Sequence, residues 1–334
     1  MSSDVVIVIV VGAAIVYGFV NGFQDVATTV TSAISTGAAS PGVAVAAAAL
    51  LNFAGAFLSL SVAATVAREI VDPEVVTPTT VLAGLAGAIA WVVLTARLEL
   101  PSSSSHALLG GVVGATLVAF GADGILGAGL VDKVLLPALA APLVAFLAAG
   151  AAIALIYRLV ARRRPSPVRR AFQAGQALSG GLLAVAHGAN DAQKAMGVIA
   201  LALIAEGSLG GGADPPFWAI ASAASAIGLG TYTGGWRMLR GGRAQVLEMD
   251  AAQAFSAQAA GAGTILAATQ LGFPISTTHA INGGVMGAGA AKRLSAVRWG
   301  VAGHILAAWL LTLPAAAAIG AAAYGLLRLL GVGP

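Results

Sequence analysis

Two short polar motifs interrupt apolar stretches of the sequence, and each carries side chains that can bind an oxyanion. Residues 101–106 read Pro-Ser-Ser-Ser-Ser-His, and residues 274–279 read Pro-Ile-Ser-Thr-Thr-His. Proline in a first turn and Ser or Thr at a cap favour a helix start, whose free N–H groups attract anions. We therefore expect half-helices that begin near Ser103 and Ser276 and present hydroxyl groups to an anion. The expected anion-binding residues are Ser103, Ser104, Ser105, Ser276, Thr277 and Thr278.

A second pair of motifs places a carboxylate within an apolar segment. Residues 21–25 read Asn-Gly-Phe-Gln-Asp, and residues 187–191 read His-Gly-Ala-Asn-Asp. Ionisable side chains at membrane depth are costly and usually functional, and a carboxylate beside an amide oxygen suits a hard cation or a proton. Because these carboxylates repel an anion until a cation binds them, cation and anion bind together more favourably than separately. The expected cation-coupling residues are Asn21, Gln24, Asp25, Asn190 and Asp191.

Three charged or titratable side chains near these motifs have two interpretations each. Lys194 follows Asp191 by three residues, so it either pairs with that carboxylate or holds the anion as a point charge. His106 and His279 lie just inside the two half-helices. They either contact the ligand or fix the hairpins by hydrogen bonds.

Composition places these motifs in a membrane protein. Of the 334 residues, 58% are hydrophobic and 9% are charged, whereas soluble domains contain about 45–50% apolar and about 25% charged residues. Several nearly uncharged segments are long enough to cross a bilayer, which takes about 20 helical residues. The basic residues behind the net charge of +4 lie in short loops, where they indicate cytoplasmic topology and not a nucleic-acid partner. The sequence thus predicts an all-α polytopic membrane protein embedded in the lipid bilayer.

The chain contains an internal duplication, which is the first feature to seek in a sequence of this kind. Residues 101–114 align without gaps on residues 274–287, with eight of fourteen positions identical. The two carboxylate motifs correspond more weakly. Two repeats are expected at 1–165 and 166–334, divided by a linker at 162–170 that holds five arginines and no acidic residue.

Corresponding loops of the two repeats differ in charge, which indicates that the repeats are inverted relative to each other. The second repeat has basic loops containing Arg237, Arg240, Arg243, Lys292, Arg293 and Arg298, whereas the loops at 68–74 and 121–124 are net acidic. Inversion requires an odd number of crossings per repeat, and both termini then face the outside of the plasma membrane.

Each repeat is expected to contain the same four elements. In the first repeat these are a broken helix through Asp25, a helix at 43–66, a re-entrant hairpin at about 79–119 and a long helix at 125–160. In the second repeat they are a broken helix through Asp191, a helix near 217–236, a re-entrant hairpin at about 251–290 and a long helix from about 297. Discontinuous helices in corresponding positions of inverted repeats are typical of the central site of a transporter.

These motifs resemble those of the inorganic phosphate transporter (PiT) family, and the likeness extends over both repeats. Residues 188–191, Gly-Ala-Asn-Asp, match the family's Gly-x-Asn-Asp motif, and residues 22–25 depart from it only by Gln24. The hairpin motifs also match. Gln193 followed by Lys194 is similar to the bacterial low-affinity branch, and the long central loop of some relatives is missing.

The resemblance implies import of inorganic phosphate by cation-coupled symport. It places phosphate at 103–105 and 276–278, with Asp25 and Asp191 nearby. The supporting residues would be Lys194, Gln193, His106 and His279. A proton, sodium held at the two aspartates, or a neutral metal-phosphate complex each agrees with Gln24 and Lys194. No bound cofactor is expected, and a homo-oligomer is compatible with the sequence.

Other functions share some of these features. Another tetrahedral oxyanion such as sulfate suits the hydroxyl motifs, but a carboxylate that accepts a hydrogen bond favours an anion that still bears a proton, as phosphate does near neutral pH. A passive anion channel would not need Asp25 and Asp191. An intramembrane metallo-hydrolase would use His187 and Asp191 at helical spacing, but it requires at least three converging ligands. We therefore predict a transporter and not an enzyme.

Overall fold

Helices make up the regular structure of this chain, as the sequence predicts. The computed structural model describes residues 3–98, 100, 102–240, 249–291 and 299–332. Every regular element in these residues is a helix, apart from an isolated bridge between Val71 and Ile125. Pro101, Arg243, Lys292, Arg293 and Arg298, which contributed to the predictions above, lie outside the described residues.

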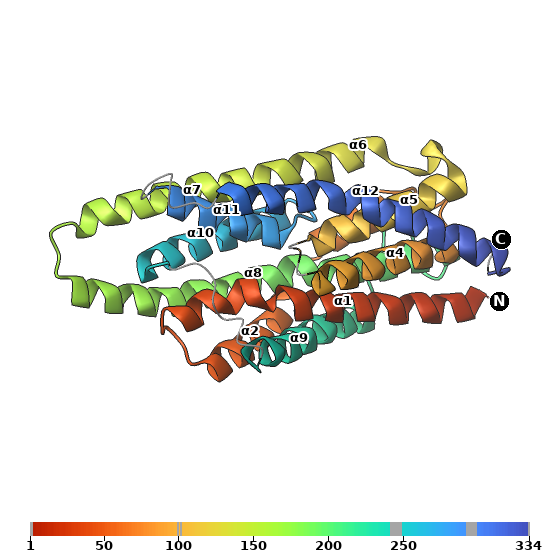
Figure 1. The fold of residues 1–334 in the computed structure, drawn as a ribbon. Coiled ribbons are helices and arrows are strands. Elements are labelled where there is room, and N and C mark those ends of the chain that lie inside the picture. Colours follow the sequence, from red (N-terminus) through yellow and green to blue (C-terminus); the bar gives the residue numbers. More distant parts are fainter. Residues whose placement is uncertain (1–2, 99, 101, 241–248, 292–298, 333–334) are drawn as a thin grey trace.

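The helices run roughly along one common direction (Figure 1). In the first half they are α1 (Ser3–Ser35), α2 (Pro41–Gly55), α3 (Ser61–Arg68), α4 (Pro78–Arg97), α5 (Ser104–Phe120), η1 (Ala122–Gly124), α6 (Gly127–Gly129), η2 (Leu130–Leu135) and α7 (Leu136–Val160). In the second half they are α8 (Pro165–Glu206), α9 (Phe217–Arg240), α10 (Ala251–Gln270), α11 (Thr277–Ala290) and α12 (Trp299–Leu329). The α4/α5 and α10/α11 pairs begin and end within one residue of the hairpins expected at 79–119 and 251–290.

Four segments of the described chain are long and apolar enough to cross a membrane. They are Asp4–Ser35, Pro78–Arg97, Gly127–Val160 and Ile305–Leu329. The α8 helix is less apolar and carries several buried polar side chains, among them His187, Asp191 and Lys194. The interior of the bundle shields those polar groups from the surroundings.

The expected broken helices are wrong, because α1 and α8 continue without interruption through Asp25 and Asp191. A glycine lies three residues before each aspartate, and it serves close packing between helices instead of a break in the helix. A Cβ atom on Gly22 would lie 2.3 Å from the carbonyl oxygen of Ile227, and a Cβ atom on Gly188 would lie 2.0 Å from that of Asn52. The carboxylates are satisfied by side chains from their own and other helices, so no unwound backbone is needed beside them.

The continuous helix expected at 43–66 is also wrong, because α2 ends at Gly55 and α3 begins at Ser61. A buried side chain replaces the backbone bonds that the break removes. The amide oxygen of Gln193 accepts hydrogen bonds from the backbone N–H groups of Val62 (2.8 Å) and Ala63 (3.1 Å). This satisfies the free donors at the start of α3.

The two hairpins enter the molecule from opposite ends (Figure 1). The α4/α5 hairpin lies toward the end where α1 begins and α12 finishes, and the α10/α11 hairpin lies toward the connection between α7 and α8. Their tips meet in the middle, where the Ser105 hydroxyl donates to the backbone oxygen of Ile275 at 2.9 Å. The α4/α5 hairpin packs on α12, and the α10/α11 hairpin packs on α7. Each hairpin thus packs on the long helix of the other half.

Glycines allow these hairpins to lie directly against the neighbouring backbones, as small residues do in membrane bundles. The contacts are those of Gly110 with Leu313, Gly114 with Ala317, Gly283 with Pro142 and Gly287 with Phe146, where an added Cβ atom would lie 2.0–2.4 Å from the carbonyl oxygen. These four glycines therefore serve close packing between helices.

Replacement of one of these glycines should therefore destabilise the protein. We expect Gly114→Ala to lower the free energy of unfolding by about 1–3 kcal/mol, because the methyl group overlaps the α12 backbone. Gly263→Ala on α10 is the matched control, since no atom lies within 4 Å of its Cβ position. It should be neutral or slightly stabilising, because Ala favours a helix. Thermal unfolding in detergent would measure both, and equal effects would contradict the close contact.

Candidate functional site

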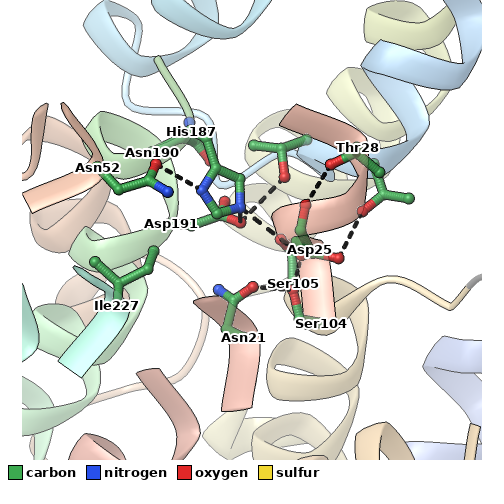
Figure 2. A network of polar contacts seen from close by, with 12 residues as sticks. Asn21, Asp25, Thr28, Asn52, Ser104, Ser105, His187, Asn190, Asp191 and Ile227 are labelled. Atoms are coloured by element: carbon green, nitrogen blue, oxygen red, sulfur yellow. Dashed lines mark hydrogen bonds and ion pairs between the residues drawn. The ribbon is translucent and has the colours of Figure 1, made fainter. Parts of the chain in front are cut away.

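The side chains expected to bind ligands meet at the centre of the molecule, where α1 and α8 pass the two hairpin tips (Figure 2). Asp25 on α1 is 4% exposed, and Asp191 on α8 is fully buried. Burial of a charge is tolerated only where other groups pair with it and hydrogen-bond to it. The neighbours of each carboxylate therefore define the site.

Ser103 and Ser276 act as N-caps of α5 and α11. The Ser103 hydroxyl oxygen accepts from the backbone N–H of His106 at 3.1 Å, and that of Ser276 accepts from His279 at 3.3 Å. The expected helix starts are confirmed. These two oxygens stabilise the helix ends, and their hydroxyl hydrogens are still able to donate to a ligand.

Asp25 receives hydroxyl groups from both hairpins. The Ser104 hydroxyl lies 3.4 Å from Asp25 Oδ2 and 3.0 Å from Asn21 Oδ1, and the Thr278 hydroxyl donates to Asp25 Oδ1 at 3.1 Å. One carboxylate thus joins α1 to the first and the second hairpin (Figure 2).

Asp191 is joined to both hairpins in a similar way, but partly through an ammonium group. The Thr277 hydroxyl donates to Asp191 Oδ2 at 3.1 Å, and Lys194 Nζ forms an ion pair with Asp191 Oδ1. Lys194 also donates to the Ser105 hydroxyl and to the backbone oxygen of Ile275. The two aspartates are therefore not chemically equivalent.

His187 lies between the two carboxylates (Figure 2). Its Nε2 atom is 3.1 Å from Asp191 Oδ2 and 3.9 Å from Asp25 Oδ2, and its Nδ1 atom is 3.0 Å from Asn52 Oδ1. Because the Asn52 amide donates to the Thr231 hydroxyl at 2.9 Å, its oxygen faces the ring and Nδ1 carries the hydrogen. Nε2 can then hold a cation or a proton. Asp25, His187 and Asp191 each offer one ligand atom, and these atoms lie within 4.8 Å of one another.

The amide residues beside the aspartates point in different directions. The Asn190 amide nitrogen donates to the Thr269 hydroxyl at 3.0 Å and to the Phe273 backbone oxygen at 3.1 Å. The side-chain oxygens of Asn190 and Gln24 are buried and have no hydrogen-bond partner in the described part of the chain. Gln193 faces α3 and not the carboxylates, so it supports the fold near the site.

The two hairpin histidines pack against each other. The rings of His106 and His279 are 4.9 Å apart, and His279 stacks on Trp309 of α12 at 3.7 Å. Their described contacts are with each other and with α12, where the two hairpins meet. These are ring contacts and not the hydrogen bonds that one interpretation of the sequence predicts, because the Nε2 atoms of both rings are buried without a hydrogen-bond partner in the described residues.

Several residues of the site escaped the sequence analysis. The Tyr17 hydroxyl donates to the backbone oxygen of Ser104 at 3.0 Å, and Tyr17 lies on the same face of α1 as Asn21 and Asp25. This spacing of four residues was a usable signal. Asn52 was also detectable, as an isolated polar residue in an apolar helix. Trp309 gave no signal, because its role depends on packing between the two halves.

A cavity of about 130 Å³ lies next to the site. Thr28, Thr31 and Ser32 of α1 line one side, and Gln258 of α10 and Asn282 of α11 line another. The cavity begins one helical turn beyond Asp25, on the side of the second hairpin. The opposite side of the site, between α8 and the first hairpin, belongs to a large apolar cluster that includes Leu85, Leu108, Met196 and Ile199.

Comparison with known proteins agrees with this arrangement. The sequence profile of a family described as the phosphate transporter family matches residues 21–320. A protein of Mycobacterium tuberculosis named a probable low-affinity inorganic phosphate transporter is 45% identical over 326 residues, which cover 97% of this chain and 78% of the relative. A Bacillus subtilis protein of the same name is 34% identical and covers 97% of both chains.

The fold also has a close match among solved structures. A structure titled "The sodium-dependent phosphate transporter" superposes with a TM-score of 0.88 at 24% identity, covering 97% of this chain and 99% of that chain. At this identity the likeness shows the fold. Together with the extent of the profile match and the identity to the curated relatives, it leads to one conclusion. The chain is an integral membrane protein that belongs to the phosphate transporter family.

Proposed function

We propose that this chain is a secondary active transporter that imports inorganic phosphate by symport with a cation. The observation that carries the proposal is the convergence of hydroxyl groups from two opposed hairpin tips on two buried carboxylates. Hydroxyl groups and helix N-termini are donors that an oxyanion requires. The carboxylates supply the place at which a cation acts.

Phosphate is held in this proposal by Ser104, Ser105, Thr277 and Thr278, with the starts of α5 and α11 adding partial positive charge. Ser103 and Ser276 hold those helix starts in position through their caps. The Asp25 and Asp191 carboxylates favour phosphate over sulfate, because only phosphate keeps a proton to donate near neutral pH.

Competition for hydroxyl hydrogens explains the coupling. A hydroxyl group has one hydrogen to donate. That of Thr278 is donated to Asp25 and that of Thr277 to Asp191, whereas the Ser104 hydroxyl lies 3.0 Å from Asn21 Oδ1 and 3.4 Å from Asp25 Oδ2. A cation or proton bound to a carboxylate makes that carboxylate a weaker hydrogen-bond acceptor, so the hydroxyl groups become free to donate to phosphate. Cation and phosphate therefore bind cooperatively.

The coupling ion is a proton or sodium. Asp25, His187 and Asp191 form a group that can hold a cation, including one bound to phosphate as a metal complex. The three ligands that a metallo-hydrolase requires are thus present. However, Asp191 is already paired with Lys194, and the named relatives are transporters, so we assign the group to coupling and not to hydrolysis. A passive channel is disfavoured because it gains nothing from two buried carboxylates.

The proposed topology has two inverted repeats, 1–165 and 166–334, with re-entrant hairpins α4/α5 and α10/α11. Entry of the hairpins from opposite ends supports this topology, as does the exchange of packing partners between halves. The arginine-rich linker at 162–170 then lies in the cytoplasm and both termini lie outside the plasma membrane. The cavity at Thr28 and Gln258 would open toward the cytoplasm.

Cysteine labelling tests the topology in this cysteine-free chain. Ser166→Cys at the start of α8 and Ala122→Cys after α5 are both exposed. A membrane-impermeant maleimide added to intact cells should label Ala122→Cys and should label Ser166→Cys only after permeabilisation. Labelling of both from the outside would show that the repeats are not inverted.

Removal of a site hydroxyl should weaken phosphate binding. We expect Thr278→Val or Ser104→Ala to raise the Kd of phosphate by about 5- to 150-fold, the loss of a hydrogen bond to a charged group worth 1–3 kcal/mol. Thr233→Val is the matched control, since its hydroxyl is exposed and donates to its own helix. Binding of radiolabelled phosphate to purified protein measures the effect. Normal binding by Ser104, Thr277 and Thr278 variants would exclude this site.

Asp25→Asn tests the coupling more cleanly than Asp191→Asn, which would leave the Lys194 ammonium without its counterion. If protons drive transport, Asn mimics the protonated carboxylate, so phosphate exchange should continue while accumulation is lost. If sodium drives it, the change removes a ligand, and both should fall. Proteoliposome uptake under separately imposed sodium and pH gradients distinguishes these cases, with Asp123→Asn at the surface as control. Normal accumulation by an Asp25→Asn variant would show that Asp25 does not couple transport.

A further inference from the structure

The ammonium group of Lys194 lies in a shell of oxygen atoms. It contacts a carboxylate oxygen of Asp191, the hydroxyl oxygen of Ser105 and, at 2.8 Å, the backbone oxygen of Ile275. Lys194 is fully buried. A carboxylate from α8, a hydroxyl from α5 and a backbone carbonyl from the segment that precedes α11 form the kind of oxygen shell that binds a hard monovalent cation in membrane transporters.

These contacts exclude a direct hold on phosphate. An ammonium group has three hydrogens to donate and no acceptor. All three have partners here, namely Asp191, Ser105 and Ile275. Lys194 therefore has no remaining donor to offer an anion, and its charge is placed where it neutralises Asp191.

The first half of the chain has the same surroundings without the ammonium group. The alignment of 21–25 on 187–191 places Thr28 opposite Lys194, and the hairpin alignment places Thr278 opposite Ser105. The Thr278 hydroxyl contacts Asp25 Oδ1 directly. The corresponding Ser105 hydroxyl is linked to Asp191 only through Lys194. Thr28 itself donates to the Asp25 backbone oxygen at 2.6 Å, so no ammonium group of the described residues lies beside the Asp25 carboxylate, and the His187 imidazole is 3.9 Å away.

From this asymmetry we propose that Lys194 is a built-in cation, which fills on the second-half side the place that an exchangeable monovalent cation would otherwise occupy. The inference rests on the proposed function and makes it more specific. Only the Asp25 side then takes up a cation from solution during transport. Lys194 thereby sets how many cations accompany each phosphate ion.

Replacement of the lysine should create a need for an external cation. In Lys194→Thr, which copies the residue of the first half, the Kd of phosphate should rise at least about tenfold in sodium-free buffer, because Asp191 loses its partner. Sodium chloride at about 100 mM should restore it to within about threefold, compared with N-methylglucamine chloride of equal ionic strength. Sodium should also raise the unfolding temperature of the phosphate-free variant more than that of the unmodified protein.

The reciprocal variant tests the same idea in the other half. Thr28→Lys places a tethered cation beside Asp25, and Thr28 borders the 130 Å³ cavity, which leaves room for the longer side chain. Phosphate binding by this variant should lose whatever sodium dependence the unmodified protein has. Lys133→Thr is the control, because Lys133 forms a partly exposed ion pair with Glu69 at 3.4 Å. It should leave the sodium response unchanged.

The outcomes separate this inference from the proposed function. If the unmodified protein binds no phosphate in either salt, the proposed function fails. If it binds phosphate but Lys194→Thr binds equally well without sodium, or is folded and not rescued by sodium, the built-in cation is excluded. If Lys194→Thr does not fold in either salt, Thr28→Lys decides, and an unchanged sodium response there overturns the inference.

Discussion

The burial of two negative charges, on Asp25 and Asp191, is the constraint on which the rest of the structure depends. A carboxylate without partners in an apolar interior is strongly destabilising. Here α5 and α11 supply hydroxyl groups, and α8 supplies an ammonium group and an imidazole. The hairpin tips must therefore reach the centre from both ends of the molecule. Each half is incomplete alone, because Asp25 contacts hydroxyl groups of both hairpins, and Asp191 contacts the second hairpin directly and the first through Lys194.

The same constraint couples ligand binding to movement of the hairpins relative to α1 and α8. The hydroxyl groups belong to the hairpins, whereas the carboxylates belong to α1 and α8 (Figure 2). A cavity bordered by Thr28 and Gln258 lies on one side of this contact, and a large, closely packed apolar cluster lies on the other. A hairpin cannot move away from α1 or α8 without separating these donors and acceptors. Occupation of the site by a cation and phosphate would change those contacts, and so would bias which side is open.

The two halves contain similar sets of elements, but residues at corresponding positions differ in their chemistry. His187 stands opposite Asn21, and Lys194 stands opposite Thr28. Both differences place cationic or cation-binding groups on the second-half side. A symmetric site would treat its two carboxylates alike, whereas here, among the described residues, Asp191 is paired with an ammonium group and Asp25 is not. That difference gives the transport cycle one distinct place for an exchangeable charge.

The sequence alone was enough to predict the helical class, the boundaries of the two helical hairpins, the helix starts at Ser103 and Ser276 and the correspondence of the polar motifs. These follow from local rules of capping, hydropathy and repeat alignment. It misjudged the continuity of α1 and α8, because a glycine three residues before an aspartate looks the same whether the chain unwinds or another backbone packs there. It also missed the break after α2, where the donors at the start of α3 bind the distant Gln193 side chain. Three roles are visible only in the folded chain: Gln193 caps α3, His187 lies between the carboxylates, and Lys194 donates its three hydrogens to groups of the protein. Those roles depend on contacts between residues far apart in the chain, which local sequence patterns do not predict.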